Sequence, residues 1–258
     1  MARKRRTTPG PYLLHLELLR DRIPDASRFP YNLPAVRGLE KLAFHPKVTF
    51  LVGENGSGKS TLLEAVAEAY GLNPEGGSQN FNFATRASHS SLGNCVRLAK
   101  TVAVAGNSYF LRAESFYNVA SEIDRIGDGI LSSYGGKSLH EQSHGESFFA
   151  LFEHRFSNHG MFLLDEPEAA LSPRRQLQFL ALLHDYVKGG SQFVIATHSP
   201  IILAYPDSLL YLIDEAGIRP TAYEETEHYA ITRGFLSNPK RSLAELFKDD
   251  EAEIRNAE

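Results

Sequence analysis

Residues 53–60 have the spacing of a phosphate-binding loop. They read GENGSGKS, with an apolar run at 48–52 before them and a helical pattern after them. Glycines in such a loop let backbone N–H groups turn inward toward an anion, and the positive N-terminus of the following helix faces the same point. Lys59 can reach the outer phosphates of a nucleotide, and the hydroxyl of Ser60 can ligate Mg²⁺. The residues predicted to line this nucleotide site are Gly53, Glu54, Asn55, Gly56, Ser57, Gly58, Lys59, Ser60 and Thr61.

A second apolar run ends in two carboxylates. Residues 161–164 read MFLL and are followed by Asp165 and Glu166. Two acids at the end of a buried strand are costly unless a cation lies nearby, so the pair indicates a metal site. Asp165 can hold Mg²⁺ through its water shell, while Glu166 can orient or deprotonate an attacking water. We therefore expect Ser60 and Asp165 to serve the metal and Glu166 to be catalytic.

The run SHGE at 143–146 is a second candidate anion site. A serine hydroxyl and a glycine N–H at the N-terminus of a helix can bind an anion. A helical pattern follows from Glu146 to Phe156. The same residues would also serve as an ordinary helix cap. Read alone, the run leaves both functions open.

Alternating strands and helices are predicted around these residues. Apolar runs bounded by Gly, Pro or charged residues predict strands, and amphipathic patterns predict helices. The predicted strands are 12–19, 48–52, 81–83, 109–113, 161–164, 192–196 and 208–213, and the predicted helices are 60–70 and 174–187. This alternation is typical of an α/β fold with a largely parallel sheet. The polar C-terminal segment, which contains Tyr229, Phe235 and Phe247, is expected to form short helices packed on the domain.

The composition favours one large domain. The chain has 258 residues, of which 42% are hydrophobic, so it can bury a full core. We expect a single domain over 11–258 after a basic, disordered tail at 1–10. The formal net charge of −4 excludes the strong positive field of a protein that coats nucleic acid. The basic run Arg3–Arg6 either contacts phosphates or is a solvated tail.

Cysteine usage and hydropathy indicate the cytoplasm. The single cysteine, Cys95, excludes an intrachain disulfide and fits a reducing compartment. No stretch approaches the ~18 uninterrupted apolar residues of a membrane-crossing helix. No apolar run follows the basic N-terminus, as it would in a secretion signal. We therefore expect a cytoplasmic protein without a transmembrane segment of its own.

The order and separation of these motifs resemble those of the ATP-binding-cassette (ABC) ATPases. The run SHGE is similar to the family signature usually written LSGGQ, because it keeps the serine and the second glycine. The resemblance implies ATP and Mg²⁺ as ligands, and a two-lobed P-loop head whose helical subdomain covers about 85–157. It further implies that Ser143, Gly145 and Glu146 meet a nucleotide held by the partner subunit, and that the loop 169–172 crosses the dimer interface. His198 would be the switch residue that hydrogen-bonds the γ-phosphate and the water, so the residues expected to act in catalysis are Lys59, Glu166 and His198.

Two local forms resemble one branch of this family. The runs DEPE, ending at Glu168, and THSP, containing Ser199, look like AAA-family ATP-binding proteins related to SMC, RecF and OLD-type heads. Transporter cassettes more often carry Thr or Ser at position 168 and Asp at 199. The interval from Lys59 to Ser143 is too short for a long coiled coil, and no TOPRIM-like nuclease domain fits after residue 215. We therefore expect a minimal head.

Two further family features have more than one candidate residue in this sequence. Tyr31 lies about where the family places an aromatic ring that stacks on adenine; Phe29 competes for this role, and core packing is the alternative for Tyr31. The family's glutamine, which links the helical lobe to Mg²⁺, has no convincing match, since Gln79 lies too close to the phosphate loop. The polar turn 85–91 offers Arg86 or His89 as substitutes, or is simply a solvated loop.

The function predicted from the sequence is that of a Mg²⁺-dependent ATPase. We expect it to close as a head-to-tail homodimer over two ATP molecules and to act on a protein partner in regulation, DNA maintenance or defence. The alternative is the nucleotide-binding subunit of an ABC transporter. A nucleotide-gated scaffold without hydrolysis is disfavoured, because Glu166 and His198 are both present. DNA binding, if it occurs, is expected to be weak and carried by local residues such as Arg3–Arg6 and Lys240–Arg241.

Overall fold

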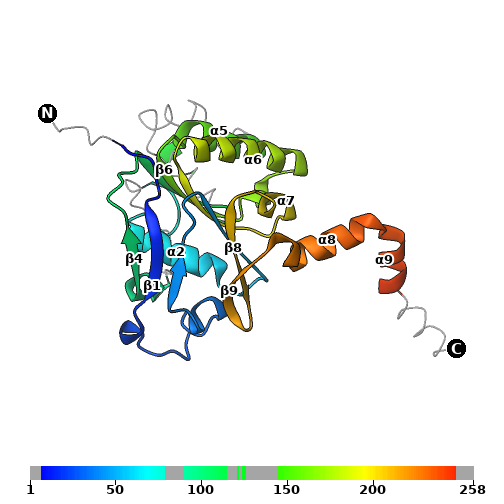
Figure 1. Ribbon diagram of the computed structural model, residues 1–258, viewed down its shortest axis with the longest axis horizontal. Coiled ribbons are helices and arrows are strands. Elements are labelled where there is room, and N and C mark those ends of the chain that lie inside the picture. Colours follow the sequence, from blue (N-terminus) through cyan, green and yellow to red (C-terminus); the bar gives the residue numbers. More distant parts are fainter. Residues whose placement is uncertain (1–6, 79–89, 115–120, 122–123, 126–143, 248–258) are drawn as a thin grey trace.

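The computed structural model describes residues 7–78, 90–114, 121, 124–125 and 144–247. Within these residues the chain forms two sheets with helices between and outside them (Figure 1). The strands are β1 Leu13–Leu18, β2 Lys41–Ala43, β3 Val48–Gly53, β4 Val96–Lys100, β5 Asn107–Arg112, β6 Gly160–Asp165, β7 Gln192–Ala196, β8 Ser208–Asp214 and β9 Gly217–Thr221. The helices are α1 Pro34–Arg37, α2 Lys59–Tyr70, α5 His144–Arg155, α6 Pro173–Lys188, α7 Pro200–Leu203, α8 Glu227–Ser237 and α9 Pro239–Leu246.

The larger sheet has six strands in the order β5-β6-β7-β3-β8-β9. Neighbouring strands from β5 to β8 are parallel, and β9 pairs with β8 in the antiparallel sense. The predicted α/β fold with a mostly parallel sheet is therefore confirmed. Because parallel strands end at the same edge, the residues after β3, β6 and β7 gather at one side of the molecule.

Side chains of the central strands alternate between two cores. On β6, Phe162 and Leu164 belong to one hydrophobic cluster, whereas Met161 and Leu163 belong to the other. All four are fully buried, so the strand is apolar on both faces. This pattern explains the continuous apolar run in the sequence, which is typical of parallel strands covered on both sides.

The first core lies beneath α5, α6 and α7. Phe148 and Phe152 of α5, and Phe156 just after this helix, follow one another at helical spacing and face the sheet. The rings of Phe156 and Phe162 stack with their centroids 4.1 Å apart, and Phe179 of α6 meets Phe152 edge-on at 5.1 Å. These aromatic contacts fix α5, and therefore the segment that begins it, against the strand that carries Asp165.

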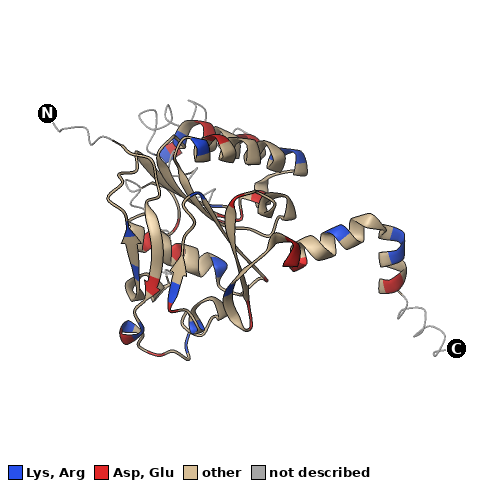
Figure 2. Ribbon diagram, in the orientation of Figure 1, with Lys and Arg blue, Asp and Glu red and all other residues tan. Residues whose placement is uncertain are grey.

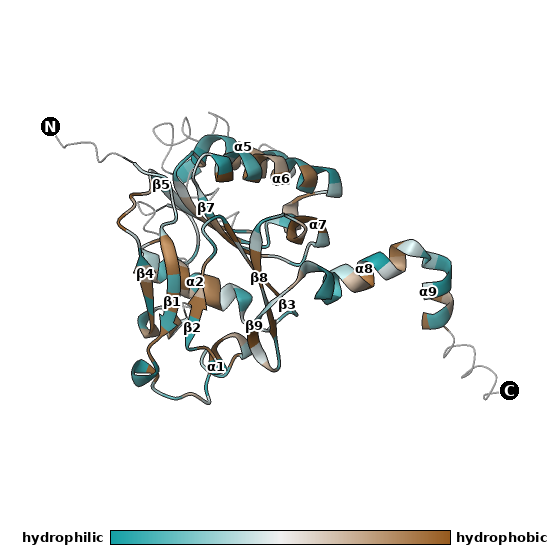
Figure 3. Ribbon diagram, viewed as in Figure 1, coloured by the Kyte–Doolittle hydropathy of each residue, from teal (hydrophilic) through white to brown (hydrophobic). Residues whose placement is uncertain are grey.

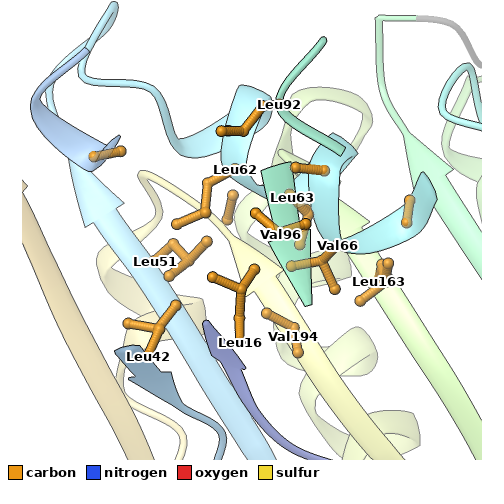
Figure 4. Close-up of a cluster of buried hydrophobic side chains, with 14 of the residues drawn as sticks. Leu16, Leu42, Leu51, Leu62, Leu63, Val66, Leu92, Val96, Leu163 and Val194 are labelled. Atoms are coloured by element: carbon orange, nitrogen blue, oxygen red, sulfur yellow. The ribbon is translucent and has the colours of Figure 1, made fainter. Parts of the chain in front are cut away.

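The second core encloses the helix that follows the phosphate loop. Leu62, Leu63 and Val66 of α2 pack between the large sheet and a three-stranded antiparallel sheet of order β2-β1-β4 (Figure 4). The helix ends at Gly71 in the left-handed conformation, as its position in the sequence predicts. With apolar neighbours on both sides, α2 holds the phosphate loop in a fixed place.

One buried side chain joins the two sheets. The Gln192 amide, at the start of β7, is fully buried. Its Oε1 accepts hydrogen bonds from the backbone N–H of Tyr12 (2.7 Å) and Leu13 (2.9 Å), and its Nε2 donates to the carbonyl oxygens of Leu13 and His45, both at 2.9 Å. Every polar position of the amide is thus used, which offsets the cost of its burial.

The C-terminal helices differ from the prediction that they pack on the domain. Figure 1 shows α8 and α9 extending away from the body, and we call these two helices the helical arm (residues 227–246). Figure 3 shows hydrophobic positions on both of them. None of their residues is buried, and Leu246 is 70% exposed. The amphipathic pattern correctly indicated helices, but it does not specify what covers their apolar faces.

The remaining predictions of strands and helices are confirmed wherever they fall on described residues. The strands predicted over 12–19, 48–52, 109–113, 161–164, 192–196 and 208–213, and the helices over 60–70 and 174–187, are confirmed within one or two residues. The short strands β2, β4 and β9 were missed. The tail Arg3–Arg6 and the predicted strand 81–83 lie outside the described residues, as does most of the range from 115 to 143. Within the range 85–157 assigned to a helical subdomain, the described part contains β4 and β5 as well as α5.

Candidate functional site

The backbone of the phosphate loop needs glycine at three positions. Gly53, Gly56 and Gly58 have φ angles of 157°, 82° and 100°. A Cβ atom at Gly53 would also lie 2.2 Å from the carbonyl oxygen of Ile213 on the neighbouring strand. Any larger residue would therefore displace the loop from the sheet. Near these glycines the buried hydroxyl of Ser57 has no hydrogen-bond partner, as expected for a group that faces a ligand.

The ammonium group of Lys59 is held inside the loop. Lys59 is 4% exposed, and its Nζ donates to the carbonyl oxygens of Gly53 (2.8 Å) and Glu54 (3.0 Å). Burial lowers its pKa, while the carboxylates of Glu166 and Asp165 oppose this shift. The positive charge of Lys59 is therefore buried and only partly neutralised, so an anionic ligand would stabilise it.

Asp165 lies at the end of β6, next to the start of α2. The hydroxyl of Ser60 donates to Asp165 Oδ1 at 3.0 Å, and Arg112 Nε lies 3.6 Å from Asp165 Oδ2. Burial raises the pKa of Asp165 to about 7, although the Arg112 guanidinium and the Ser60 hydrogen bond act in the opposite direction. A desolvated carboxylate of this kind gains most from a nearby cation.

These two residues fit a Mg²⁺ ion bound together with a nucleotide. Hydroxyl and carboxylate oxygens are the ligands that Mg²⁺ prefers, and it commonly takes one or two from protein and the rest from phosphates and water. In the part of the chain that the structure describes, no group of three or more His, Cys, Asp or Glu side chains could hold a metal by itself. Such an ion would thus depend on the phosphates of the nucleotide.

Arg112 is a site residue that sequence reasoning missed. It ends β5 and pairs in register with Asp165, and its guanidinium also contacts Glu64 of α2 (2.5 Å) and Glu114 (3.1 Å). It therefore connects the helix after the phosphate loop with the acidic strand. The expected substitutes for the family's glutamine, Arg86 and His89, lie outside the described residues.

Glu166 adopts a backbone conformation that is rare for its residue type. Its φ and ψ are 51° and 52°, in the left-handed region, and its N–H donates to the carbonyl oxygen of Ala196 on β7 at 2.9 Å. Strain of this kind persists where the surrounding structure compensates for it, and it is common at functional sites. The turn brings the Glu166 carboxylate, whose side chain is 42% exposed, beside His198.

His198 lies in the loop after β7 and is held on two sides. Glu168 Oε1 accepts the backbone N–H of His198 at 2.5 Å, and His198 Nε2 lies 3.6 Å from Glu166 Oε1. The other ring nitrogen, Nδ1, is 3.1 Å from Nε2 of His228, a residue of α8 that sequence reasoning also missed. Burial lowers the pKa of His198, and the nearby Lys59 lowers it further. The ring is therefore neutral near pH 7.

Tyr31, the residue predicted to stack on adenine, packs in the second core. Its ring is 5% exposed, and its hydroxyl oxygen lies 2.7 Å from Ser91 Oγ and 3.6 Å from Cys95 Sγ. Phe29, the competing candidate, is 66% exposed. It lines a pocket that also includes Leu33, Asn55, Gly56, Gly58, Lys59, Ser60, Thr61 and Glu166.

The described part of the run SHGE begins a helix. His144, Gly145 and Glu146 form the first residues of α5, and Ser143 lies outside the described residues. A Cβ atom at Gly145 would lie 3.5 Å from the carbonyl oxygen of Ala170. The start of α5 therefore lies next to the turn Pro167–Ala170 that follows the acidic pair.

Comparison with known proteins gives consistent matches. Residues 31–88 match the family described as "P-loop containing region of AAA domain", and 131–204 match "AAA domain, putative AbiEii toxin, Type IV TA system". The "Cytochrome c biogenesis ATP-binding export protein CcmA" of Mesorhizobium japonicum is 30% identical over 58% of this chain and 78% of its own length. The CcmA protein of Rhizobium johnstonii is 32% identical over 58% of this chain and 75% of its own length. The chain belongs to the ABC ATPases.

A solved structure of this family shares the fold. An ATP-binding cassette of an ABC transporter in its ADP conformation superimposes with a TM-score of 0.50 over 90% of this chain and 97% of its own, at 18% sequence identity. The family matches and the ATP-binding relatives show that the protein is a P-loop ATPase that binds a nucleotide. Among the described residues of this ABC ATPase, no helix has the length and apolar content needed to cross a membrane.

The buried carboxylate predicts a pH-dependent effect on stability. Because burial raises the pKa of Asp165 to about 7, the folded ATPase binds a proton there that the unfolded chain releases above its ordinary value near 3.8. Stability is therefore lost as pH rises through this window. Asp165→Asn should raise the free energy of unfolding by about 1–3 kcal/mol at pH 8 and by much less at pH 5, measured by urea unfolding without nucleotide or metal.

The adjacent exposed carboxylate gives a matched control. Glu166→Gln also removes one negative charge but leaves the buried carboxylate in place, so stability at both pH values should stay close to that of the wild type. Equal stabilisation by the two substitutions would contradict the assignment of the effect to burial.

The pocket beside Phe29 predicts which aromatic side chain contributes to nucleotide affinity. Phe29→Ala should weaken ATP binding by roughly 1 kcal/mol, or about fivefold, because it removes an exposed ring beside the phosphate loop. Tyr31→Phe should leave the affinity unchanged, because the hydroxyl that it removes contacts Ser91 in the core. Calorimetric titration measures both. A Phe29→Ala affinity within twofold of the wild type would rule out the stacking role.

Proposed function

We propose that this ABC ATPase hydrolyses ATP with Mg²⁺ bound at Ser60 and Asp165. The observation that carries the proposal is the convergence of Lys59, Asp165 and the Glu166–His198 pair at the edge of the sheet where the phosphate loop lies. A buried cation, a buried carboxylate and a carboxylate–histidine pair are the groups needed for the phosphates, the metal and the water.

The first step of the proposed mechanism is binding of the triphosphate. Backbone N–H groups of 53–61 and the N-terminus of α2 receive the phosphates. Lys59 exchanges its bonds to two loop carbonyls for bonds to the outer phosphate oxygens, and it gains charge pairing in doing so. When bound, Mg²⁺ would neutralise the developing charge on the phosphates.

The second step concerns the water. The Glu166 carboxylate is the only candidate base among the described residues that both lines the Phe29 pocket and contacts His198. It accepts a proton from the attacking water, while a proton on His198 Nε2 hydrogen-bonds the γ-phosphate. Arg112 holds the Asp165 carboxylate from the opposite side, so that it stays directed toward Ser60.

We further propose that hydrolysis takes place in a head-to-tail homodimer. The support is Gly145 and Glu146 in the first turn of α5, with Ser143 just before them in the sequence, since a second anion site is useful when it meets a nucleotide held by another subunit. The turn at 167–170, beside the start of α5, would form part of the same interface. The output is a movement that a protein partner in regulation, DNA maintenance or defence would receive.

The nucleotide-binding subunit of a membrane transporter is the second candidate. It is favoured by the two relatives named export proteins. Against it stand Glu168 and Ser199, where transporter cassettes more often carry other residues. The glutamine through which transporter cassettes typically couple to membrane subunits also has no convincing match in the sequence. A DNA-binding role receives less support, because Figure 2 shows basic and acidic positions interspersed over the described elements.

Substitutions at the phosphate loop and at the acidic strand should separate binding from chemistry. Lys59→Ala should abolish detectable ATP binding, because it removes the charge that neutralises the outer phosphates. Glu166→Gln should retain affinity within about threefold and lose at least 10²-fold in turnover, measured by phosphate release. Turnover of Glu166→Gln near the wild-type rate would show that another group activates the water.

The homodimer proposal predicts a nucleotide-dependent mass. Glu166→Gln should be mainly monomeric alone and dimeric with ATP and Mg²⁺ in light scattering, since ATP trapped without hydrolysis holds the two subunits together. Ser143→Arg in the same background should stay monomeric, because a bulky cation blocks the second anion site. A dimer that tolerates Ser143→Arg would show that the run SHGE is only a helix cap.

A further inference from the structure

A pair of histidines joins the nucleotide site to the base of the helical arm. His198 follows β7, and His228 lies in the first turn of α8. His198 Nδ1 and His228 Nε2 are 3.1 Å apart, and the ring centroids are separated by 5.3 Å. Both rings are partly buried, and the remaining nitrogens, His198 Nε2 and His228 Nδ1, have no hydrogen-bond partner. The pair thus shares one hydrogen bond and leaves one nitrogen of each ring without a partner.

The environment of the pair favours neutral rings. Burial lowers the pKa of both histidines, and Lys59 lowers both further. The carboxylates of Glu166 and Glu54 oppose the shift for His198, and those of Glu54 and Glu227 oppose it for His228. Two neutral imidazoles can form one N–H···N hydrogen bond, so one ring donates and the other accepts.

The position of Glu166 indicates which ring donates. His198 Nε2 lies 3.6 Å from Glu166 Oε1. If His198 donated from Nδ1, its Nε2 would present a lone pair to this carboxylate, and the two would repel. If His228 donates from Nε2, the proton of His198 is on Nε2 and is attracted by the carboxylate. The second arrangement also directs an N–H group toward the site expected for the γ-phosphate.

We propose that His228 is a positioning residue that donates from Nε2 to His198 Nδ1 and thereby fixes the His198 proton on Nε2. The inference rests on the proposed function, because that function gives His198 the task of donating to the γ-phosphate. It makes His228, a residue of the helical arm, a determinant of the reaction. His228 acts by setting the orientation and the tautomer of the His198 ring, which it contacts.

The first turn of α8 is fixed well enough for this task. Thr226 caps the helix, is fully buried, and donates from Oγ1 to the carbonyl oxygen of Tyr223 at 2.7 Å. The Tyr223 hydroxyl in turn donates to the carbonyl oxygen of Pro200 at 2.8 Å, two residues after His198. The segments that carry the two histidines are therefore tied together independently of the histidine pair.

Two substitutions of similar size separate the hydrogen bond from packing. His228→Gln places an amide N–H₂ near the position of the imidazole Nε2 and can still donate to His198 Nδ1, whereas His228→Leu fills the space without a donor. Two-bond ¹⁵N–¹H spectra of histidine-labelled, nucleotide-free protein report the tautomer directly. The wild type and His228→Gln should show His198 protonated on Nε2, and His228→Leu should show a mixture of tautomers.

The same variants should separate turnover from affinity. His228→Leu is expected to lower kcat by about 10- to 100-fold with KM for ATP within twofold, and His228→Gln should stay within about threefold of the wild-type kcat. His184 provides a control, because it is an exposed histidine of α6 whose Nδ1 lies 3.2 Å from the Tyr205 hydroxyl. His184→Leu should change neither the His198 signals nor kcat.

Two results would overturn the proposal. One is a wild-type spectrum with the His198 proton on Nδ1, and the other is an unchanged His198 tautomer in His228→Leu. His198→Ala tests the proposed function separately, since hydrolysis at the wild-type rate in that variant would remove His198 from the mechanism. The spectra of the wild type and His228→Leu would still decide whether His228 sets the His198 tautomer.

Discussion

Burial of the Asp165 carboxylate at the end of β6 costs free energy, because water cannot solvate the charge there. The neighbouring elements offset part of this cost. Ser60 supplies a hydrogen bond from α2, and Arg112 supplies a positive charge from β5. Arg112 is itself paired with Glu64 of α2. The helix after the phosphate loop and two strands are thus held around one charge that the protein only partly neutralises. Under the proposed function, Mg²⁺ and a nucleotide would complete an arrangement that already exists.

The parallel sheet explains how residues far apart in the sequence share this edge. Strands β5, β6, β7 and β3 run in the same direction, and each ends at the same side. Arg112, Asp165, the His198 loop and Gly53 therefore lie at the same edge of the sheet. The left-handed turn at Glu166 then directs its carboxylate across toward His198. The strain in that turn is offset by its hydrogen bond to β7 and by the buried strands on both sides.

The sequence predicted those parts of the structure that depend on patterns of neighbouring residues. The glycine spacing of 53–58, the apolar strands and the cap at Gly71 all reflect neighbouring residues, and the structure confirms the strands and the cap. Arg112 and His228 were missed because their roles depend on strand register and on a helix far along the chain. Tyr31 and Phe29 are two positions apart, and only the path of the intervening turn decides which ring enters the core. The helical arm is a further example, because an amphipathic pattern predicts a helix but does not predict which part of the protein covers its apolar face.

Strand β7 has one fixed contact at its start and another just beyond its end. At its start, Gln192 uses all its hydrogen bonds to hold the antiparallel sheet, and just beyond its end the His198 backbone is held by Glu168. A strand advances about 3.3 Å per residue and reverses its side chains at each step. One inserted or deleted residue would therefore turn either the amide or the histidine away from its contacts. Among homologues, we expect the length of the segment 192–198 to vary less than its sequence. Its constant length can then serve as a reference when the sequences of distant family members are aligned.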